Sequence, residues 1–225
     1  MRKEPLSPAQ IRELFERDGA VVSGGHFVYA SGKHGSTYVN KDILLSDPLR
    51  AQVLAEELGR KIVTEGVHRG VEVVVGPAMS GIKMSHLVAH VLSTEDRRVL
   101  AVYAEKDGPD AFALRRGFDD VVQDRRVLIA EDIVNEATTS RRVIEAVVSA
   151  GGIVAGVTAL WNRGSQREIV LPVPSSARAA KIPIVSLVEE RLQAWGEDEC
   201  PLCARKVPFN SLGHAKAFLQ KKPPA

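Results

Sequence analysis

The chain has 225 residues, a formal net charge of +2, a hydrophobic fraction of 44% and a charged fraction of 26%. These values are ordinary for one soluble domain, and the near-neutral balance gives no support for a nucleic-acid partner. No apolar run approaches the roughly 20 residues that span a bilayer, and the N-terminus lacks the apolar core of a signal peptide. The two cysteines do not make a disulfide framework. We therefore expect a cytoplasmic protein with no membrane partner.

A short helix and a β-hairpin are predicted at the N-terminus. Ser7-Pro8 is typical of a helix start, with Ser7 as the N-cap and Pro8 in the first turn. Apolar residues then alternate on both sides of Ser31-Gly32-Lys33, which predicts two strands joined by a turn.

Downstream of the hairpin, apolar runs alternate with amphipathic helical patterns. This order predicts an α/β fold with a mainly parallel sheet and helices on both of its faces. In such sheets ligands bind at the carboxyl ends of the strands. Strands are expected at 71–76, 98–103, 126–130, 153–160 and 182–188, the last at a sheet edge because it contains Pro183, and helices at 49–63, 82–92 and about 140–150.

The segment from Val127 to Ser140 carries the most specific chemistry. An apolar strand reaches the adjacent acids Glu131 and Asp132, and a short polar loop then enters a helix. A helix start presents free backbone N–H groups and the positive end of the helix dipole, so it suits a phosphate. Carboxylates at the strand end are acceptors for sugar hydroxyls, so the segment predicts a phosphoribosyl site.

Glu131-Asp132 and Thr138-Thr139 also resemble the phosphoribosyl-diphosphate (PRPP) motif of the type I phosphoribosyltransferases. Three further segments, in the same order as in that family, resemble orotate phosphoribosyltransferases. Ser31-Gly32-Lys33 with Tyr38 to Lys41 is similar to their N-terminal hood, Gly76 to Gly81 to the diphosphate loop, and Ala104 to Phe118 to the catalytic loop. The resemblance covers roughly residues 20 to 205.

The resemblance implies the type I phosphoribosyltransferase fold in residues 1–205, with a hood in about 1–48, and a separate tail in 206–225. It implies transfer of phosphoribose from PRPP to orotate, with Mg²⁺ carried by PRPP and no direct metal ligand. A homodimer is implied because the catalytic loop of this family usually reaches the neighbouring subunit. The implied roles are diphosphate stabilisation by Lys106, Arg115 and Arg116; PRPP binding by Glu131, Asp132, Asn135, Glu136, Ala137, Thr138 and Thr139; a diphosphate loop of Ala78, Met79, Ser80 and Gly81; and base binding by Tyr38, Lys41 and Arg163.

The 5′-phosphate loop departs from the family pattern. Asn135-Glu136-Ala137 stands where the family usually has Thr-Thr-Gly or Thr-Ala-Gly. If Ala137 adopts a positive φ, the backbone strain is on the order of 1 kcal/mol. A Glu136 carboxylate about 5 Å from a phosphate would cost on the order of 3 kcal/mol, whereas one that points to solvent would cost almost nothing.

Two alternatives to orotate transfer remain. A phosphoribosyltransferase for another base would keep the phosphate machinery and change the hood and the Arg163 contacts. A non-catalytic regulator that senses PRPP or nucleotides would keep the fold and lose efficient chemistry.

The tail carries a Cys-x-x-Cys pair, Cys200 and Cys203. A zinc site needs four ligands, and His214 is the one further candidate near them in the sequence. The sequence therefore disfavours zinc ligation by this pair, with a site shared across a dimer as the alternative. His86 and His90 have i, i+4 spacing but no third ligand nearby, so they are expected to be helix-face residues. Lys221 to Ala225 is expected to be disordered.

Overall fold

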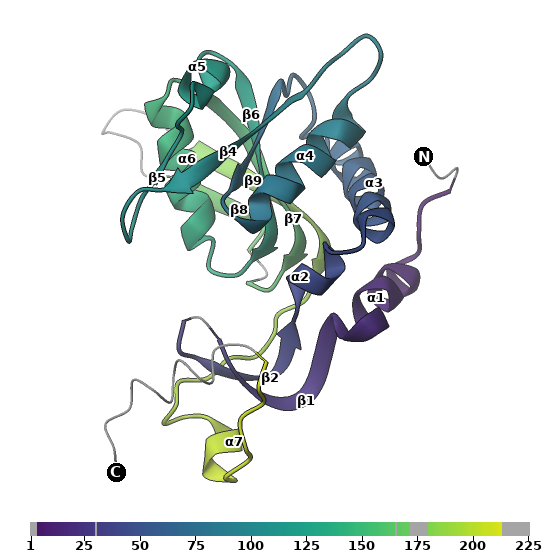
Figure 1. Ribbon diagram of the computed structural model, residues 1–225, viewed down its shortest axis with the longest axis vertical. Helices are drawn as coiled ribbons and strands as arrows, with labels where there is room; N and C mark the ends of the chain where they lie inside the picture. Colours follow the sequence, from purple (N-terminus) through teal and green to yellow (C-terminus); the bar gives the residue numbers. More distant parts are fainter. Residues whose placement is uncertain (1–3, 30, 165, 172–179, 213–225) are drawn as a thin grey trace.

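The computed structural model describes residues 4–29, 31–164, 166–171 and 180–212. It contains a large sheet with helices and a separate N-terminal hairpin (Figure 1). The helices are α1 (Pro8–Glu16), α2 (Lys41–Leu44), α3 (Pro48–Thr64), α4 (Ser80–Leu92), α5 (Phe118–Val122), α6 (Thr138–Ser149) and α7 (Pro201–Ala204), with a 3₁₀ turn η1 (Arg17–Gly19). The strands are β1 (Val21–Val28), β2 (His34–Val39), β3 (Val73–Pro77), β4 (Leu100–Lys106), β5 (Phe112–Ala113), β6 (Arg126–Val134), β7 (Ile153–Asn162), β8 (Glu168–Leu171) and β9 (Ala180–Glu189).

The large sheet has seven strands in the order β5-β4-β3-β6-β7-β9-β8. Its central strands β4, β3, β6, β7 and β9 pair in parallel, and the short outer strands β5 and β8 pair antiparallel. The predicted α/β class and the mainly parallel sheet are confirmed. Because the central strands run the same way, the carboxyl ends of β3, β4 and β6 lie at one edge of the sheet, where the candidate site forms.

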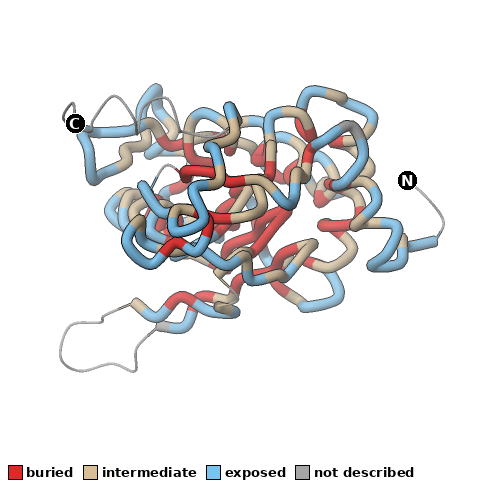
Figure 2. The backbone as a smooth tube through the Cα atoms, turned by 90° about the horizontal axis from the view of Figure 1, so that it is seen from below, coloured by how far each residue is buried: buried red, intermediate tan, exposed pale blue. Residues whose placement is uncertain are grey.

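Helices cover both faces of the sheet, as the sequence predicts. Alternate residues of one strand pack into different hydrophobic clusters: Val74 packs with α3 and α4, whereas Val73 and Val75 pack with α6. This alternation follows from the period-2 side-chain geometry of a strand. Figure 2 shows the buried residues in the middle of the molecule and the exposed residues around them.

The N-terminal hairpin forms its own two-stranded sheet. β1 and β2 pair antiparallel from Val21↔Val39 to Val28↔His34, with an irregularity between Ser23 and Phe27. The hairpin lies with α7 away from the large sheet (Figure 1). Its strand β2 also pairs with the C-terminal segment, since His34 and Trp195 exchange two backbone hydrogen bonds of 2.8 Å.

Two details of the strand predictions are wrong. β9 is an internal strand, with β7 on one side and β8 on the other. Pro183 is tolerated there because the parallel ladder with β7 begins at Ile184, one residue later. β6 continues to Val134, so the paired acids lie within the last residues of the strand rather than beyond its end.

Five short elements were not predicted: α2, β5, α5, β8 and α7, each of two to five residues. Such lengths are too short for a hydrophobic period to be read from a sequence. Among the described residues, none of the helices has the length and apolar content of a membrane span. The expected disorder of 221–225 concerns residues outside the described ranges.

Candidate active site

The turn between β3 and α4 is closed by two glycines. A Cβ atom added to Gly76 would lie 1.9 Å from the carbonyl oxygen of Gly81, and one added to Gly81 would lie 2.5 Å from Cδ of Pro77. Neither position therefore accepts a side chain. The turn contains a cis peptide bond between Ala78 and Met79, and Met79 is exposed. The two glycines thus bring the start of α4 against the end of β3. The role of this turn as a diphosphate loop stays a prediction.

The end of β6 carries two buried acids with different partners. The Glu131 carboxylate accepts a short hydrogen bond from the Ser140 hydroxyl, which lies in the first turn of α6. The Asp132 carboxylate forms an ion pair with Lys41, with 2.9 Å between Nζ and Oδ2. The strand, the following helix and the start of α2 thereby meet at one point.

Burial acts on the pKa of Glu131 and on that of the neighbouring Lys41. Burial raises the pKa of Glu131 to about 7, and the neighbouring charge of Asp132 adds to this rise, against the Ser140 hydrogen bond and the Lys41 charge. For Lys41, burial works against the charged ammonium, but the charge and close contact of Asp132, together with the charges of Asp42 and Glu131, outweigh it and raise the Lys41 pKa. Glu131 thus binds a proton in the neutral range, while Lys41 keeps its charge.

The Oδ2 atom of Asp132 lies next to a positive charge, but among the described residues no hydrogen-bond donor is aligned with it. The 2.9 Å contact of Oδ2 with Lys41 satisfies the distance of an ion pair. Within the described part of the chain, however, this buried oxygen has no partner with hydrogen-bond angles. A buried carboxylate oxygen without an aligned donor can accept a hydrogen bond from a hydroxyl group of a ligand.

The start of α6 is shaped for an anion. Its N-cap residue Ala137 has φ 54°, and no side chain caps the first turn. The positive φ on which the expected strain depended is therefore present. Free N–H groups at the start of a helix of 12 residues bind phosphate through hydrogen bonds and the helix dipole.

These parts surround a cavity of about 210 Å³ at the carboxyl edge of the sheet. We call it the sheet-edge cavity. Seven of the residues expected to bind PRPP or diphosphate line it together with Lys106 and Lys41. Its lining residues are Lys41, Pro77, Ala78, Met79, Ser80, Gly81, Lys106, Phe112, Glu131, Asp132, Ile133 and Thr139.

The cations of the predicted catalytic loop are placed differently from one another. Lys106 is exposed at the end of β4 and lines the sheet-edge cavity. Arg115 pairs with Asp107 at 2.8 Å, and Arg116 pairs with Glu105 at 2.7 Å. Both arginines therefore stay on the β4–β5 hairpin and do not line the cavity. Both arginine side chains are exposed, so water screens these ion pairs and they hold the arginines only weakly.

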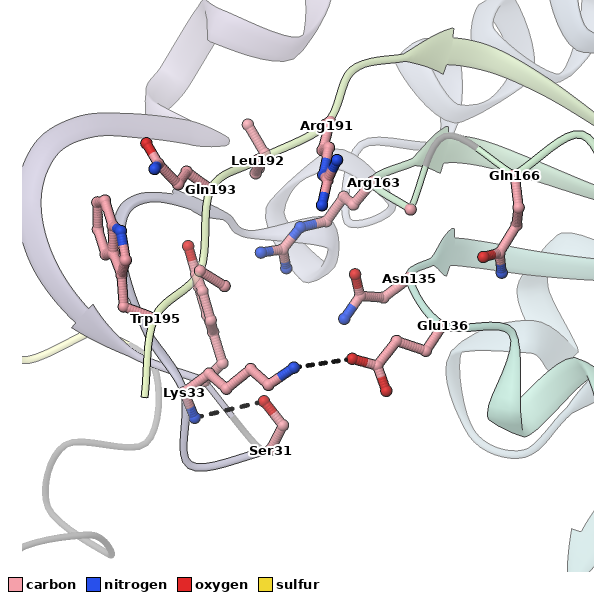
Figure 3. Close-up of a pocket in the computed structure, with 13 residues that line it drawn as sticks. Ser31, Lys33, Asn135, Glu136, Arg163, Gln166, Arg191, Leu192, Gln193 and Trp195 are labelled. Atoms are coloured by element: carbon pink, nitrogen blue, oxygen red, sulfur yellow. Dashed lines mark hydrogen bonds and ion pairs between the residues drawn. The ribbon is translucent and has the colours of Figure 1, made fainter. Parts of the chain in front are cut away.

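A second and larger cavity of about 650 Å³ lies between the hood and the sheet (Figure 3). We call it the hood cavity. Three cationic side chains, Lys33, Arg163 and Arg191, line it, with Glu136 as the one carboxylate among its lining residues. The remaining lining residues are Tyr29, Ser31, Asn135, Gly164, Gln166, Leu192, Gln193, Ala194 and Trp195.

Arg163 is held over an aromatic ring at this cavity. Its guanidinium carbon lies 4.4 Å from the centroid of the Tyr29 ring, a cation–π contact. Tyr29 is itself fixed, because its hydroxyl donates a 2.6 Å hydrogen bond to the carbonyl of Thr37. Within the described part of the chain, the buried Nε of Arg163 has no hydrogen-bond partner, so it keeps a donor for a ligand.

Of the other two residues expected at the base, neither lines the hood cavity. Tyr38 stacks on Phe27, with ring centroids 5.6 Å apart. Lys41 lies at the sheet-edge cavity, where Asp132 binds it.

Glu136 points to the hood. Its carboxylate forms a 3.0 Å ion pair with Lys33, and both side chains are largely exposed (Figure 3). The Glu136 charge is thus partly neutralised by a residue of the hood turn. This arrangement lowers the repulsion that a carboxylate in the 5′-phosphate loop would exert on a bound phosphate.

Sequence reasoning missed the segment that closes the hood cavity and the glycine beside it. Residues 191–195 contribute five lining residues but form no strand or helix with a readable period. Gly164 packs so closely that an added Cβ would lie 1.9 Å from the carbonyl oxygen of Asn135. The available signal was the Arg163-Gly164 turn after a buried strand.

Two histidines that the sequence did not indicate as metal ligands also lie near Cys200 and Cys203. His26 and His34 lie beside the two cysteines in space, although they are more than 160 residues away in the chain. His214, the candidate from the sequence, lies outside the described residues. His86 and His90 are exposed on α4, as expected.

A parallel sheet with a phosphate-type helix start and paired acids at its edge defines a phosphoribosyltransferase of the type I fold. No family model matches the chain. It is 32% identical over 203 residues to an orotate phosphoribosyltransferase of Thermus thermophilus, an alignment that spans 90% of this chain and 99% of the relative. The chain belongs to the orotate phosphoribosyltransferase family.

Solved structures share the fold at lower identity. An orotate phosphoribosyltransferase of Mycobacterium tuberculosis H37Rv, in complex with PRPP, has a TM-score of 0.52 at 16% identity, over 81% of this chain and 88% of that one. An adenine phosphoribosyltransferase of Thermoanaerobacter pseudethanolicus has a TM-score of 0.54 at 19% identity, over 81% of this chain and 99% of that one. Enzymes for different bases therefore share this fold.

Proposed function

We propose that the protein transfers phosphoribose from PRPP to orotate, giving orotidine 5′-phosphate and diphosphate in pyrimidine synthesis. The observation that carries this proposal is the position of the two cavities on either side of one segment. Glu131, Asp132 and Thr139 line the sheet-edge cavity, whereas Asn135 and Glu136 line the hood cavity. A phosphoribosyl group bound along this segment has its phosphate at α6 and its ribose at the acids, with room for a base on the hood side.

The charges of the hood cavity favour an anionic base. Lys33, Arg163 and Arg191 outnumber Glu136 among its lining residues, and Glu136 is already paired with Lys33. Orotate carries a carboxylate, and a guanidinium binds a carboxylate through two parallel hydrogen bonds. Adenine and other neutral bases have no charge to balance these cations. This cavity therefore supports orotate among the bases that the shared fold accommodates.

The acids at the sheet-edge cavity fit sugar hydroxyls better than a directly bound metal. Mg²⁺ prefers carboxylate oxygens, but Glu131 is bonded to Ser140 and Asp132 is paired with Lys41. The residues present fit a Mg²⁺ held mainly by the diphosphate and the ribose hydroxyls of PRPP. When bound, that ion neutralises part of the charge on the leaving diphosphate.

The cations of the β4–β5 hairpin have the remaining task in this proposal. As the bond from ribose C1 to diphosphate breaks, negative charge gathers on the departing oxygens. Lys106 already lines the cavity, and Arg115 and Arg116 reach it after leaving their exposed partners Asp107 and Glu105. Closure of such a loop over the substrate also excludes water.

The experiment that tests the proposal is a diphosphate-release assay with Mg²⁺, PRPP and a panel of bases that includes orotate, uracil, adenine and hypoxanthine. We expect release with orotate alone. Turnover of another base in place of orotate would show a different specificity, and PRPP binding without turnover of any base would favour a sensing regulator. The Mg²⁺ requirement, the homodimer and the cytoplasmic location stay predictions, to be checked by chelation, light scattering and cell fractionation.

A further inference from the structure

A second chemical cluster lies at the hood, apart from both cavities. His26 of β1, His34 of β2, Cys200 and Cys203 direct one ligand atom each to a common point, and all four atoms lie within 4.8 Å of one another. His26, His34 and Cys200 are at most 2% exposed. Both cysteines are thiols rather than a disulfide. Four soft or borderline ligands therefore share one small volume of the interior.

Four of the six distances among these atoms are close to the edges of a tetrahedron around one ion. Metal–ligand bonds of zinc place two nitrogens about 3.3 Å apart, and a nitrogen and a sulfur about 3.6 Å apart. The two ring nitrogens, His26 Nε2 and His34 Nδ1, are 3.2 Å apart. Nitrogen–sulfur distances are 3.2 Å from His34 Nδ1 to Cys203, 3.6 Å from His26 Nε2 to Cys200 and 3.7 Å from His26 Nε2 to Cys203.

The orientation of His26 is fixed by a bond on the side of the ring away from the cluster. Its Nδ1 lies 2.7 Å from the carbonyl oxygen of Val207. A carbonyl only accepts, so Nδ1 carries the proton and donates it, and the lone pair of Nε2 faces the cluster. A backbone carbonyl bound to the outer nitrogen is a common support for a histidine that ligates zinc.

The surroundings keep water from the cluster. Phe209 packs on both imidazoles, with its ring centroid 4.4 Å from that of His26 and 5.3 Å from that of His34. Leu202, between the two cysteines, is also buried. Two thiolates balance the charge of one divalent ion, so the loaded site is neutral and suits a dry position. Space for one ion excludes an iron–sulfur cluster, whose several atoms need ligands farther apart.

We propose that His26, His34, Cys200 and Cys203 bind one structural Zn²⁺ that fastens the C-terminal segment to the hood. The ligand set of two cysteines and two histidines, complete with four protein atoms, is that of a closed structural site rather than a catalytic one. The proposal does not depend on the identity of the base or on catalysis.

The position of the ion gives it a defined structural task. His34 is the neighbour of Lys33 and is bonded through its backbone to Trp195, and both Lys33 and Trp195 line the hood cavity. The ion joins these two walls, which belong to segments more than 160 residues apart in the chain. A two-stranded hairpin is only marginally stable by itself, so a metal cross-link is an effective support.

The test is metal analysis of the full chain, purified without a metal-affinity tag from cells grown with zinc and then dialysed. Inductively coupled plasma mass spectrometry should find about one zinc per chain. Cys200→Ser and His34→Gln should each lower this content at least fivefold, whereas the exposed-histidine control His90→Gln should keep it. Less than about a tenth of a zinc per chain in the unaltered protein would overturn the proposal.

A spectroscopic measurement covers variants that fail to fold. The unaltered protein, exchanged into Co²⁺ after mild chelation, should show the intense visible bands of a tetrahedral site with thiolate charge transfer. The weak bands of an octahedral ion would contradict the proposed ligand set. Native thiol titration distinguishes the remaining explanation: a Cys200–Cys203 disulfide in the freshly purified protein, with no zinc released on denaturation, would also overturn it.

Discussion

The two cavities differ in how the chain builds them. The sheet-edge cavity is made from strand-to-helix turns in the parallel sheet, with buried acids held by neighbours such as Ser140 and Lys41. The hood cavity is made from four segments distant in sequence, and its side chains are joined by exposed contacts such as Lys33–Glu136. In the function we propose, the chemistry common to the fold belongs to the regular part of the molecule, and the choice of the base belongs to the cavity assembled from distant segments.

Replacement of Lys106 by alanine should have the largest effect on activity. The effect should arise at the sheet-edge cavity and leave the hood cavity unchanged. Removal of one charge at the departing diphosphate should lower kcat on the order of 10²–10³-fold. Because Lys106 is exposed, the free energy of unfolding should change by less than about 0.5 kcal/mol. Steady-state kinetics and urea unfolding measure the two quantities.

The matched control is Lys181→Ala, which removes an exposed lysine of β9, on the other side of the sheet from β4. This variant should keep full activity. If Lys106→Ala retains the parent kcat, Lys106 has no part in the mechanism.

Glu131→Gln should change the pH dependence of stability. Since the Glu131 pKa is raised from 4.5 to about 7 in the folded protein, the folded chain binds more protons than the unfolded chain between these pH values. The free energy of unfolding contributed by this group therefore falls as pH rises through that window, on the order of 3 kcal/mol in total. Glutamine still accepts the Ser140 hydrogen bond and cannot titrate, so this fall should disappear.

Urea unfolding at pH 5 and pH 8 checks that expectation. The stability of Glu131→Gln relative to the parent should rise from the lower to the higher pH, while the exposed control Glu145→Gln shows no such trend. Parallel pH profiles for the parent and Glu131→Gln would mean that Glu131 ionises as an ordinary carboxyl.

Arg163→Lys sharpens the distinction between the cavities. Lysine keeps the charge but loses the fork that binds a carboxylate at two points, which is worth about 2 kcal/mol. We expect the KM for orotate to rise about 30-fold and the KM for PRPP to change by less than about threefold. An equal rise in both KM values would show that the cavities do not divide the substrates in this way.

Ala137→Gly should have the smallest effect. Glycine relieves the strain of φ 54°, on the order of 1 kcal/mol, but removes a buried methyl group and loosens the unfolded chain by similar amounts. The free energy of unfolding should therefore change by less than about 1 kcal/mol in either direction. Stabilisation of more than about 2 kcal/mol in thermal or urea unfolding would mean that the native loop holds more strain than its φ indicates.

The sequence predicted those parts in which neighbours along the chain are also neighbours in space. The β6–α6 unit follows from an apolar run, two acids and a helical period, and even the left-handed residue at Ala137 could be anticipated from a family glycine. The position of Pro183 in an internal strand could not be predicted, because a proline is accepted there only if pairing with β7 begins after it.

The sequence did not predict the contacts between segments that lie far apart in the chain. Nothing local to Trp195 indicates that it pairs with His34, and nothing local to His26 indicates two cysteines 174 and 177 residues later. Such pairings are set by the packing of the whole domain and have no sequence period.

The hydrogen bonds that join the hood to the C-terminal segment have a consequence for folding. His26 bonds Val207 across 181 residues, a separation close to the full length of the domain. Closing so long a loop carries a large entropy cost, so such contacts form late. We therefore expect the hairpin to be among the last segments to reach its native structure. The sheet-edge cavity should accordingly form earlier in folding than the hood cavity, because one wall of the hood cavity belongs to the hairpin turn.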